Sequence, residues 1–139
     1  MARPVITIFV RSIPTMLSVS EIDRLVRGCF VYVPDLEEYD VREDWRSHEG
    51  AVRAGEVFRG DCDDFALTVA VIAKQEGYAP DDIRLAYVVT ETGGGHLVCL
   101  IGDQMIDNRM RGPVPDTFPR YQWGSSMSLA RPGIWQEVI

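Results

Sequence analysis

The most regular hydrophobic pattern in the chain follows Asp61 and ends near Gly77. Apolar residues recur there at the spacing of one wide helical face, which predicts a buried helix; they are Phe65, Ala66, Val69, Ala70, Ile72 and Ala73. Acidic residues crowd the first turn, where carboxylates suit the positive end of the helix dipole, and Gly77 is a natural C-terminal stop. The expected helix therefore begins beside Cys62.

A second helix is predicted from Ser18 to near Gly28. Ser18 and Glu21 have the spacing of a capping box, and apolar residues at helical spacing follow them. Ahead of this helix, the apolar run over residues 5–10 favours a strand. The first part of the chain is thus expected to contribute one strand and one amphipathic helix.

The stretch between the two predicted helices is mostly charged. Residues 30–33 are expected to form a short extended piece that Pro34 closes. Residues 35–59 are interpreted as a loop that carries a short helix near residues 48–54. His48 lies on a polar part of this loop and is expected to be solvated. The large apolar anchors of the loop are Trp45 and Phe58.

After Gly77 the pattern changes to that of strands. Strands are predicted over residues 83–90 and 96–101, and a third begins at residues 105–107. The turns between them are too short for helical crossovers, so the sheet should be antiparallel and packed against the Cys62 helix, an α+β fold. An edge strand is expected over 133–139, whereas 113–131 carries no clear pattern.

Hairpin register brings two polar residues of these strands together. If the chain turns at Gly102-Asp103, Ile101 pairs with Gln104 and Leu97 pairs with Asn108. Asp107 then faces Val98, or His96 after a small adjustment of the register. The sequence therefore predicts that Asp107 reaches the His96 ring.

Length and charge limit the function further. The 139 residues are expected to form one domain, residues 1–139, and the net charge of −7 argues against nucleic acid as a partner. No apolar run approaches the roughly 20 residues that span a bilayer, so membrane insertion is not expected. The start of the chain shows no secretory signal, which favours a cytoplasmic protein, or a periplasmic one if a signal was removed.

Three cysteines at wide, unequal spacing indicate neither a zinc knuckle nor a disulfide framework. Cys62 is the candidate nucleophile, because unpaired N–H groups at a helix start favour a thiolate. Its three neighbouring aspartates oppose the negative sulfur, so a paired histidine or a cation is required. Cys29 and Cys99 lie among apolar residues and are expected in the core.

Each candidate has a plainer interpretation. Cys62 alone would read as a small buried hydrophobic residue, and His96 as a strand-start histidine with a satisfied hydrogen bond. The Asp107-Asn108 dipeptide suits a turn. Helix capping and pairing with the helix dipole account for the acidic residues around the cysteine; they are Asp61, Asp63 and Asp64.

A set of short motifs resembles the bacterial transglutaminase-like cysteine peptidases. The most specific block is Gly60-Asp61-Cys62-Asp63-Asp64-Phe65-Ala66, and the order and spacing of the others add weight to it. The other pieces are Tyr32-Val33-Pro34-Asp35, Asp44-Trp45, Glu49, Gly95-His96-Leu97-Val98 and Ile106-Asp107-Asn108. The resemblance runs from about residue 21 to residue 108 and implies a papain-like or transglutaminase-like core.

The resemblance implies a Cys-His-Asp site made of Cys62, His96 and Asp107, which acts on a protein or peptide substrate. Trp45, Gly94 and Gly95 are expected to line the substrate cleft. Cleavage of a peptide or amide bond through a thioester is the favoured reaction. Transglutaminase or deamidase chemistry uses the same triad, and a catalytically silent binding domain or phage accessory protein would keep the same fold.

The same resemblance implies a cation. Periplasmic members of the family cleave surface adhesins and need calcium, held partly by acidic residues that flank the cysteine. The corresponding residues here are Asp61 and Asp63, and Asp63 stands where the family usually has a longer Glu. No cofactor is required for the chemistry itself, whereas Ca²⁺ beside the sulfur would offset the charge of the aspartates. Small phage-encoded or intracellular relatives are an equally close comparison, and the sequence carries no signal for an oligomeric state.

Overall fold

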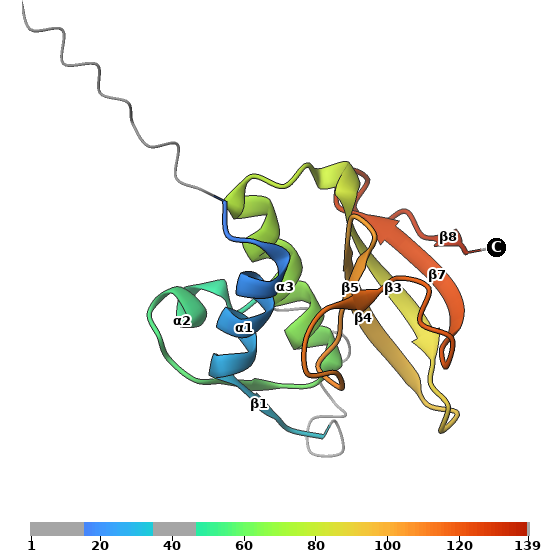
Figure 1. The fold of residues 1–139 in the computed structure, drawn as a ribbon, viewed down its shortest axis with the longest axis horizontal. Coiled ribbons are helices and arrows are strands. Elements are labelled where there is room, and N and C mark those ends of the chain that lie inside the picture. The colour runs from blue at the N-terminus through green and yellow to red at the C-terminus, as the bar shows by residue number, and fades with distance from the viewer. Residues whose placement is uncertain (1–15, 35–46, 139) are drawn as a thin grey trace, which may run out of the picture.

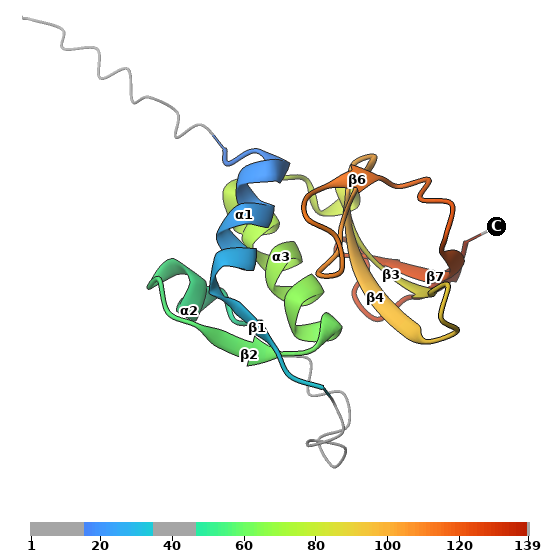
Figure 2. The same ribbon diagram turned by 60° about the horizontal axis from the view of Figure 1, so that its bottom comes forward.

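Three helices lie on one side of a six-stranded sheet, and α3 is the helix that packs against it (Figure 1). The computed structural model describes residues 16–34 and 47–138. The helices are α1 (Val19–Cys29), α2 (Glu49–Arg53) and α3 (Cys62–Glu76), and a 3-10 turn, η2 (Pro80–Asp82), leads into the sheet. Turning the molecule shows α3 between α1 and the sheet (Figure 2). The expected strand over residues 5–10 lies outside the described residues.

Sequence-local signals fix the ends of both long helices. The Ser18 side chain accepts from the Glu21 backbone N–H, and the Glu21 carboxylate accepts from that of Ser18, which completes the predicted capping box. At the other end of α3, Gly77 adopts a left-handed conformation with φ of 105°, which glycine tolerates at little steric cost. Both helix predictions are therefore confirmed.

The large sheet has the strand order β6-β5-β4-β3-β7-β8, with every pair antiparallel. Its strands are β3 (Ile83–Val89), β4 (Gly95–Ile101), β5 (Gln104–Ile106), β6 (Val114–Pro115), β7 (Gln122–Ser128) and β8 (Gln136–Glu137). The α+β prediction and the edge strand near the C-terminus are confirmed. The segment that carried no sequence pattern supplies β6 and β7, and β7 pairs with β3 at the centre of the sheet.

A second, two-stranded sheet corrects one prediction. The stretch 35–59 was expected to be a loop with a short helix. Helix α2 is present, but Phe58 and Arg59 belong to β2 (Phe58–Gly60). This strand pairs in parallel with β1 (Phe30–Tyr32), so that Phe30 lies opposite Phe58. The pairing joins segments far apart in sequence and leads the chain directly into α3.

Most of the core lies between the helices and the sheet. Its fully buried members come from α1, α3 and the helix-facing side of the strands, and include Ile22, Phe65, Ile72, Leu85 and Leu97. A smaller cluster covers the other face and contains Val98, Leu100, Met105 and Tyr121. Cys99 is fully buried, and Cys29 packs against the main core, as expected of both. No helix in the described part of the chain is both long and apolar enough to cross a membrane.

Candidate active site

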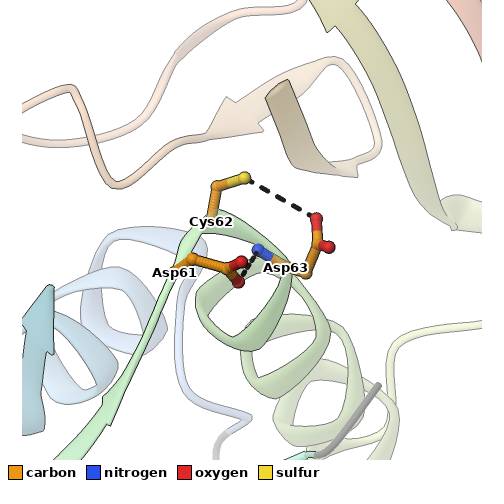
Figure 3. A group of neighbouring side chains, drawn as sticks. All are labelled: Asp61, Cys62 and Asp63. Atoms are coloured by element: carbon orange, nitrogen blue, oxygen red, sulfur yellow. Dashed lines mark hydrogen bonds between the residues drawn. The ribbon is translucent and has the colours of Figure 1, made fainter. Parts of the chain in front are cut away.

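The start of α3 is built around Asp61. Its Oδ1 accepts from the backbone N–H groups of Asp63 at 2.9 Å and Asp64 at 3.4 Å, and the Asp64 carboxylate accepts from the N–H of Asp61 at 3.0 Å. This reciprocal cap holds Cys62 at the first helical position; Figure 3 shows the bond from the Asp63 N–H to Asp61. Gly60 makes room for the Asp64 side chain, since a Cβ at this position would lie 2.4 Å from the Asp64 carboxyl carbon. The capping role that the sequence offered for Asp61 is therefore realised.

The thiol of Cys62 is half-buried and donates to Asp63 Oδ1 at 3.6 Å (Figure 3). Burial raises the pKa of this thiol to about 12; a hydrogen bond that the sulfur accepts from the Leu97 backbone opposes the rise, and the charges of Asp63 and Asp61 add to it. The tension between the thiolate and its acidic neighbours, predicted from the sequence, is thus present. At neutral pH the resting sulfur is protonated, so its activation needs a proton acceptor or a nearby cation.

His48 is only partly exposed and packs against other side chains, which corrects the prediction of a solvated residue. Its ring stacks on Phe58 at 4.8 Å between centroids, and its Nε2 lies 2.9 Å from Asp64 Oδ1. The backbone N–H of His48 donates to the Thr68 hydroxyl at 2.9 Å. The prediction failed because its aromatic partner lies on β2, a strand that the sequence pattern did not reveal. His48 supports the capped start of α3 from outside.

His96 and Asp107 form a buried pair. His96 Nε2 lies 2.6 Å from Asp107 Oδ1, with the two side chains 7% and 0% exposed. The register places Ile101 opposite Gln104, as predicted, and the ladder ends with Cys99 opposite Ile106, one step before the predicted pair of Leu97 and Asn108. Asp107 therefore follows on the face of the sheet that His96 and Val98 share, and the two side chains meet diagonally without any shift of register. Because Nε2 contacts Asp107, Nδ1 is the ring nitrogen that remains for another partner.

Asp107 also begins a turn, which the Asp107-Asn108 dipeptide favours, and its side chain reaches the His96 ring as predicted. The Met110 N–H donates to its carbonyl at 3.0 Å, while its side chain holds His96. Burial by itself raises the pKa of the Asp107 carboxyl, but hydrogen bonds from His96, Tyr121 and the Arg109 backbone, with the charge of the imidazole, lower it below its usual value. Asp107 is therefore ionised at neutral pH.

Tyr121 belongs to this cluster and was missed by the sequence analysis. Its hydroxyl donates to Asp107 Oδ2 and accepts from Arg109 at 3.1 Å. Its ring meets the His96 ring edge-on at 5.8 Å. The only signal in the sequence was an aromatic residue in a stretch rich in Pro and Gly. The partner of such a residue cannot be assigned until β7 is placed in the sheet.

Arg27 connects α1 with the same region. Its guanidinium donates to the backbone carbonyls of Asp107 at 2.9 Å and Asn108 at 3.2 Å, and pairs with Asp23 at 2.6 Å. The guanidinium also lies over the Phe65 ring at 5.3 Å. Helix α1 therefore anchors the turn that follows β5.

The predicted site residues are brought together in two parts. His96 and Asp107 touch, whereas Cys62 approaches β4 at the Leu97 backbone, next to His96. Among the described residues no hydrogen bond joins the Cys62 sulfur to the His96 ring; its side-chain partner is Asp63. Gly94 and Gly95 lie exposed at the turn from β3 to β4, directly before His96. The predicted cleft residue Trp45 lies outside the described residues.

The acidic flank of Cys62 was tested as a cation site. One ligand atom from each of Asp61, Cys62 and Asp63 lies within 4.8 Å of the others. The two carboxylates are the type of donor that Ca²⁺ takes, whereas the sulfur is not, and Ca²⁺ needs about six to eight oxygens. Asp61 Oδ1 already serves the helix cap. The set therefore fits Ca²⁺ in kind, with other oxygens needed to complete the coordination shell.

Comparison with known proteins gives a family and a fold for the chain. A family model for the bacterial transglutaminase-like cysteine proteinases matches residues 9–139. The fold is similar to that of Legionella pneumophila LapG. The calcium-bound form has 17% identity, coverage of 84% of this chain and 67% of that one, and a TM-score of 0.65. The EGTA-treated form has 17% identity, coverage of 87% and 66%, and a TM-score of 0.68.

A third LapG structure gives 19% identity, coverage of 83% and 66%, and a TM-score of 0.65. The chain therefore spans about two thirds of the length of the LapG chains that it matches. At these identities the likeness concerns the fold. A search of the curated proteins found no match.

Proposed function

The chain belongs to the bacterial transglutaminase-like cysteine proteinases, and we propose that it cleaves a peptide or amide bond with Cys62 as nucleophile, His96 as base and Asp107 as the acid that orients the base. The observation that carries the proposal is the buried 2.6 Å contact between His96 Nε2 and Asp107 Oδ1, with the Cys62 sulfur against the neighbouring backbone of β4. An ionised Asp107 fixes the ring so that Nδ1 is left to accept a proton.

The reaction begins when the Cys62 thiol leaves Asp63 and gives its proton to His96 Nδ1. The sulfur adds to the substrate carbonyl carbon, and the carbonyl electron pair moves to the oxygen. The Cys62 backbone N–H lies in the first turn of α3, where the helix offers it no carbonyl partner. This N–H stabilises the oxyanion.

Collapse of this intermediate expels the amine, which takes the proton from His96 as the carbon–nitrogen bond breaks. The thioester that remains is attacked by water, whose proton passes to His96. The carbon–sulfur bond then breaks, the acid is released and the proton returns to sulfur. An amine in place of water would give transamidation; the choice depends on access of the acceptor to the thioester.

Alkylation with iodoacetamide tests the triad. Site-resolved mass spectrometry follows each of the three cysteines across pH. Cys62 should react faster than Cys29 and the buried Cys99, and His96→Ala should slow Cys62 about tenfold or more near pH 7, because the proposed acceptor of the thiol proton is then missing. The control is Asp81→Asn, at an exposed position on η2, which should leave the rate at Cys62 unchanged. Slow labelling of all three cysteines would instead support a silent binding domain.

We also propose that Asp61 and Asp63 contribute carboxylate oxygens to a calcium site. The calcium-bound state of LapG, a protein of similar fold, motivates the proposal, and the charge around Cys62 supports it. Bound calcium would supply positive charge beside the sulfur and lower the pKa of the thiol. Calorimetric titration with Ca²⁺ should show binding that Asp63→Asn weakens and that Asp81→Asn, at an exposed position on η2, leaves unchanged. Equal heats for Asp63→Asn and the parent protein would exclude Asp63 as a ligand.

A further inference from the structure

We infer that Tyr121 is a positioning residue for the proposed triad: its hydroxyl holds the carboxylate oxygen of Asp107 that His96 does not use. By doing so it fixes which oxygen faces the imidazole. The inference rests on the proposed function, because it assigns Tyr121 a role through His96 and not in contact with the substrate. Tyr121 lies just before β7, in the segment whose role the sequence did not indicate.

The Asp107 carboxylate is completely buried, and the protein satisfies both of its oxygens. Oδ1 accepts from His96 Nε2 at 2.6 Å and from the Arg109 backbone N–H at 2.9 Å. Oδ2 accepts from the Tyr121 hydroxyl. A buried carboxylate oxygen without a donor is unfavourable. Without the hydroxyl, rotation of the carboxylate to share its remaining donors, or entry of water, would compete with the geometry that faces His96.

The direction of the Tyr121 hydrogen bond follows from its neighbours. A guanidinium can only donate, so the hydroxyl oxygen accepts from Arg109 at 3.1 Å. An ionised carboxylate can only accept, so the hydroxyl proton points to Asp107. Burial raises the pKa of Tyr121, and the charge of Asp107 raises it further, while Arg109 opposes the rise; the net shift keeps the hydroxyl protonated.

Charged groups around the cluster preserve this arrangement. Arg109 is held by Glu91, at 2.5 Å between Nη2 and Oε1, and its guanidinium lies over the Tyr121 ring at 5.7 Å. Arg27 approaches from α1, but its hydrogen bond to Asp107 goes to the backbone carbonyl and not to the carboxylate. Cys62 and its aspartates lie at the start of α3. Among the side chains that the structure describes, His96 and Tyr121 are therefore the two that form a hydrogen bond with the buried carboxylate.

The ring and the hydroxyl of Tyr121 can be separated by substitution. Tyr121 is 5% exposed, and its ring packs edge-on against His96 and, at 4.9 Å between centroids, against Phe118. Tyr121→Phe keeps these contacts and removes only the oxygen. Tyr78→Phe is the matched control, because Tyr78 also donates a hydrogen bond, to the Leu17 carbonyl at 2.8 Å, far from the site.

Two measurements on these variants test the inference. The first is the rate of Cys62 alkylation by iodoacetamide at pH 7, which should fall about tenfold in Tyr121→Phe, the scale of one hydrogen bond to a charged group. The second is the downfield proton resonance of His96 Nε2–H, which should broaden through faster exchange with water. Tyr78→Phe should change neither. The spectroscopic readout matters because a purely packing role would be retained by Phe.

The outcomes distinguish the inference from the proposed function. If alkylation of the parent protein does not depend on His96, the proposed triad fails. If it does depend on His96 but Tyr121→Phe matches the parent, or slows alkylation while leaving the resonance sharp, the positioning role is wrong. Should Tyr121→Phe not fold, as judged by circular dichroism, Arg109→Ala provides the test. It removes the donor to the same hydroxyl and should shift both readouts in the same direction by a smaller factor; unchanged readouts would overturn the inference.

Discussion

Arg27 Nη2 donates to the backbone carbonyl of Asp107 at 2.9 Å and thereby ties α1 to the end of the β4–β5 hairpin. Removal of this side chain in Arg27→Ala should destabilise the protein by about 2–3 kcal/mol. The variant loses two hydrogen bonds to carbonyls and leaves the buried Asp23 carboxylate without its partner. We expect a smaller loss of stability than for a fully buried ion pair, because the Arg27 side chain is 26% exposed.

Urea unfolding measures this loss, and the same helix offers a control. Arg24 is exposed, so Arg24→Ala should change the unfolding free energy by less than about 0.5 kcal/mol. Equal effects of the two substitutions would show that Arg27 does not anchor the turn. Cys62 alkylation in Arg27→Ala, measured under conditions where the variant is folded, should also slow, because the turn sets the position of Asp107.

Asp63 is expected to restrain the resting thiol. Its charge and its 3.6 Å contact with the sulfur both help to raise the pKa of Cys62 to about 12, after burial as the main cause. In calcium-free buffer, Asp63→Asn should lower that pKa and increase the rate of Cys62 alkylation about three- to tenfold near pH 8, since each unit of pKa changes the thiolate fraction tenfold.

The effect of calcium on the alkylation rate should require the Asp63 carboxylate. It should accelerate alkylation of the parent protein, whose aspartates it would neutralise, and have little effect on Asp63→Asn. Asp81→Asn, at an exposed site on η2, should behave as the parent does with and without calcium. A slower reaction of Asp63→Asn in calcium-free buffer would contradict the restraining role.

Two glycines should respond to alanine in opposite directions. At Gly60 a Cβ would lie 2.4 Å from the Asp64 carboxyl carbon and 2.5 Å from its Cβ, so the side chain that completes the α3 cap must move. Gly60→Ala should cost about 1–3 kcal/mol, the usual range for overpacking. At Gly28, within α1, the added Cβ meets no atom within 4 Å. Gly28→Ala should stabilise the protein by about 0.5–1 kcal/mol.

Thermal or urea unfolding of both variants measures these two changes in stability. The comparison is informative because the chemical change is the same and only the surroundings differ. Gly60→Ala as stable as the parent would mean that the Asp64 cap contributes little. A destabilised Gly28→Ala would mean that α1 does not tolerate the side chain that its backbone geometry admits.

Sequence patterns predicted those parts of the fold that local interactions determine. The capping box at Ser18, the apolar face of α3 and the stop at Gly77 each depend on residues within a few positions of one another. The contact between His96 and Asp107 was also predictable, because a two-residue turn fixes the register of a hairpin.

Long-range pairing explains what the sequence did not reveal. Strand β7 contains Gly124, Ser125 and Ser126, which have weak strand preference. It is placed by β3, where a Cβ at Gly124 would lie 3.1 Å from the Tyr87 carbonyl oxygen, near an irregularity in the register. Tyr121 reaches Asp107 because of that placement. In the same way, His48 acquires its ring partner only once β2 pairs with β1.

The Asp107 carboxylate should make stability depend on acid. Hydrogen bonds hold its pKa below the usual value, so its contribution is present above about pH 4, the range where an unfolded Asp is ionised, and is lost as the pH falls through the lowered pKa. Asp107→Asn should therefore be less stable than the parent by about 2–3 kcal/mol at pH 7, as expected for hydrogen bonds to a buried charge. The difference should shrink below pH 4. Urea unfolding at several pH values checks this, with Asp81→Asn expected to match the parent throughout. A difference that stays constant down to pH 2 would show that ionisation of Asp107 does not contribute to folding.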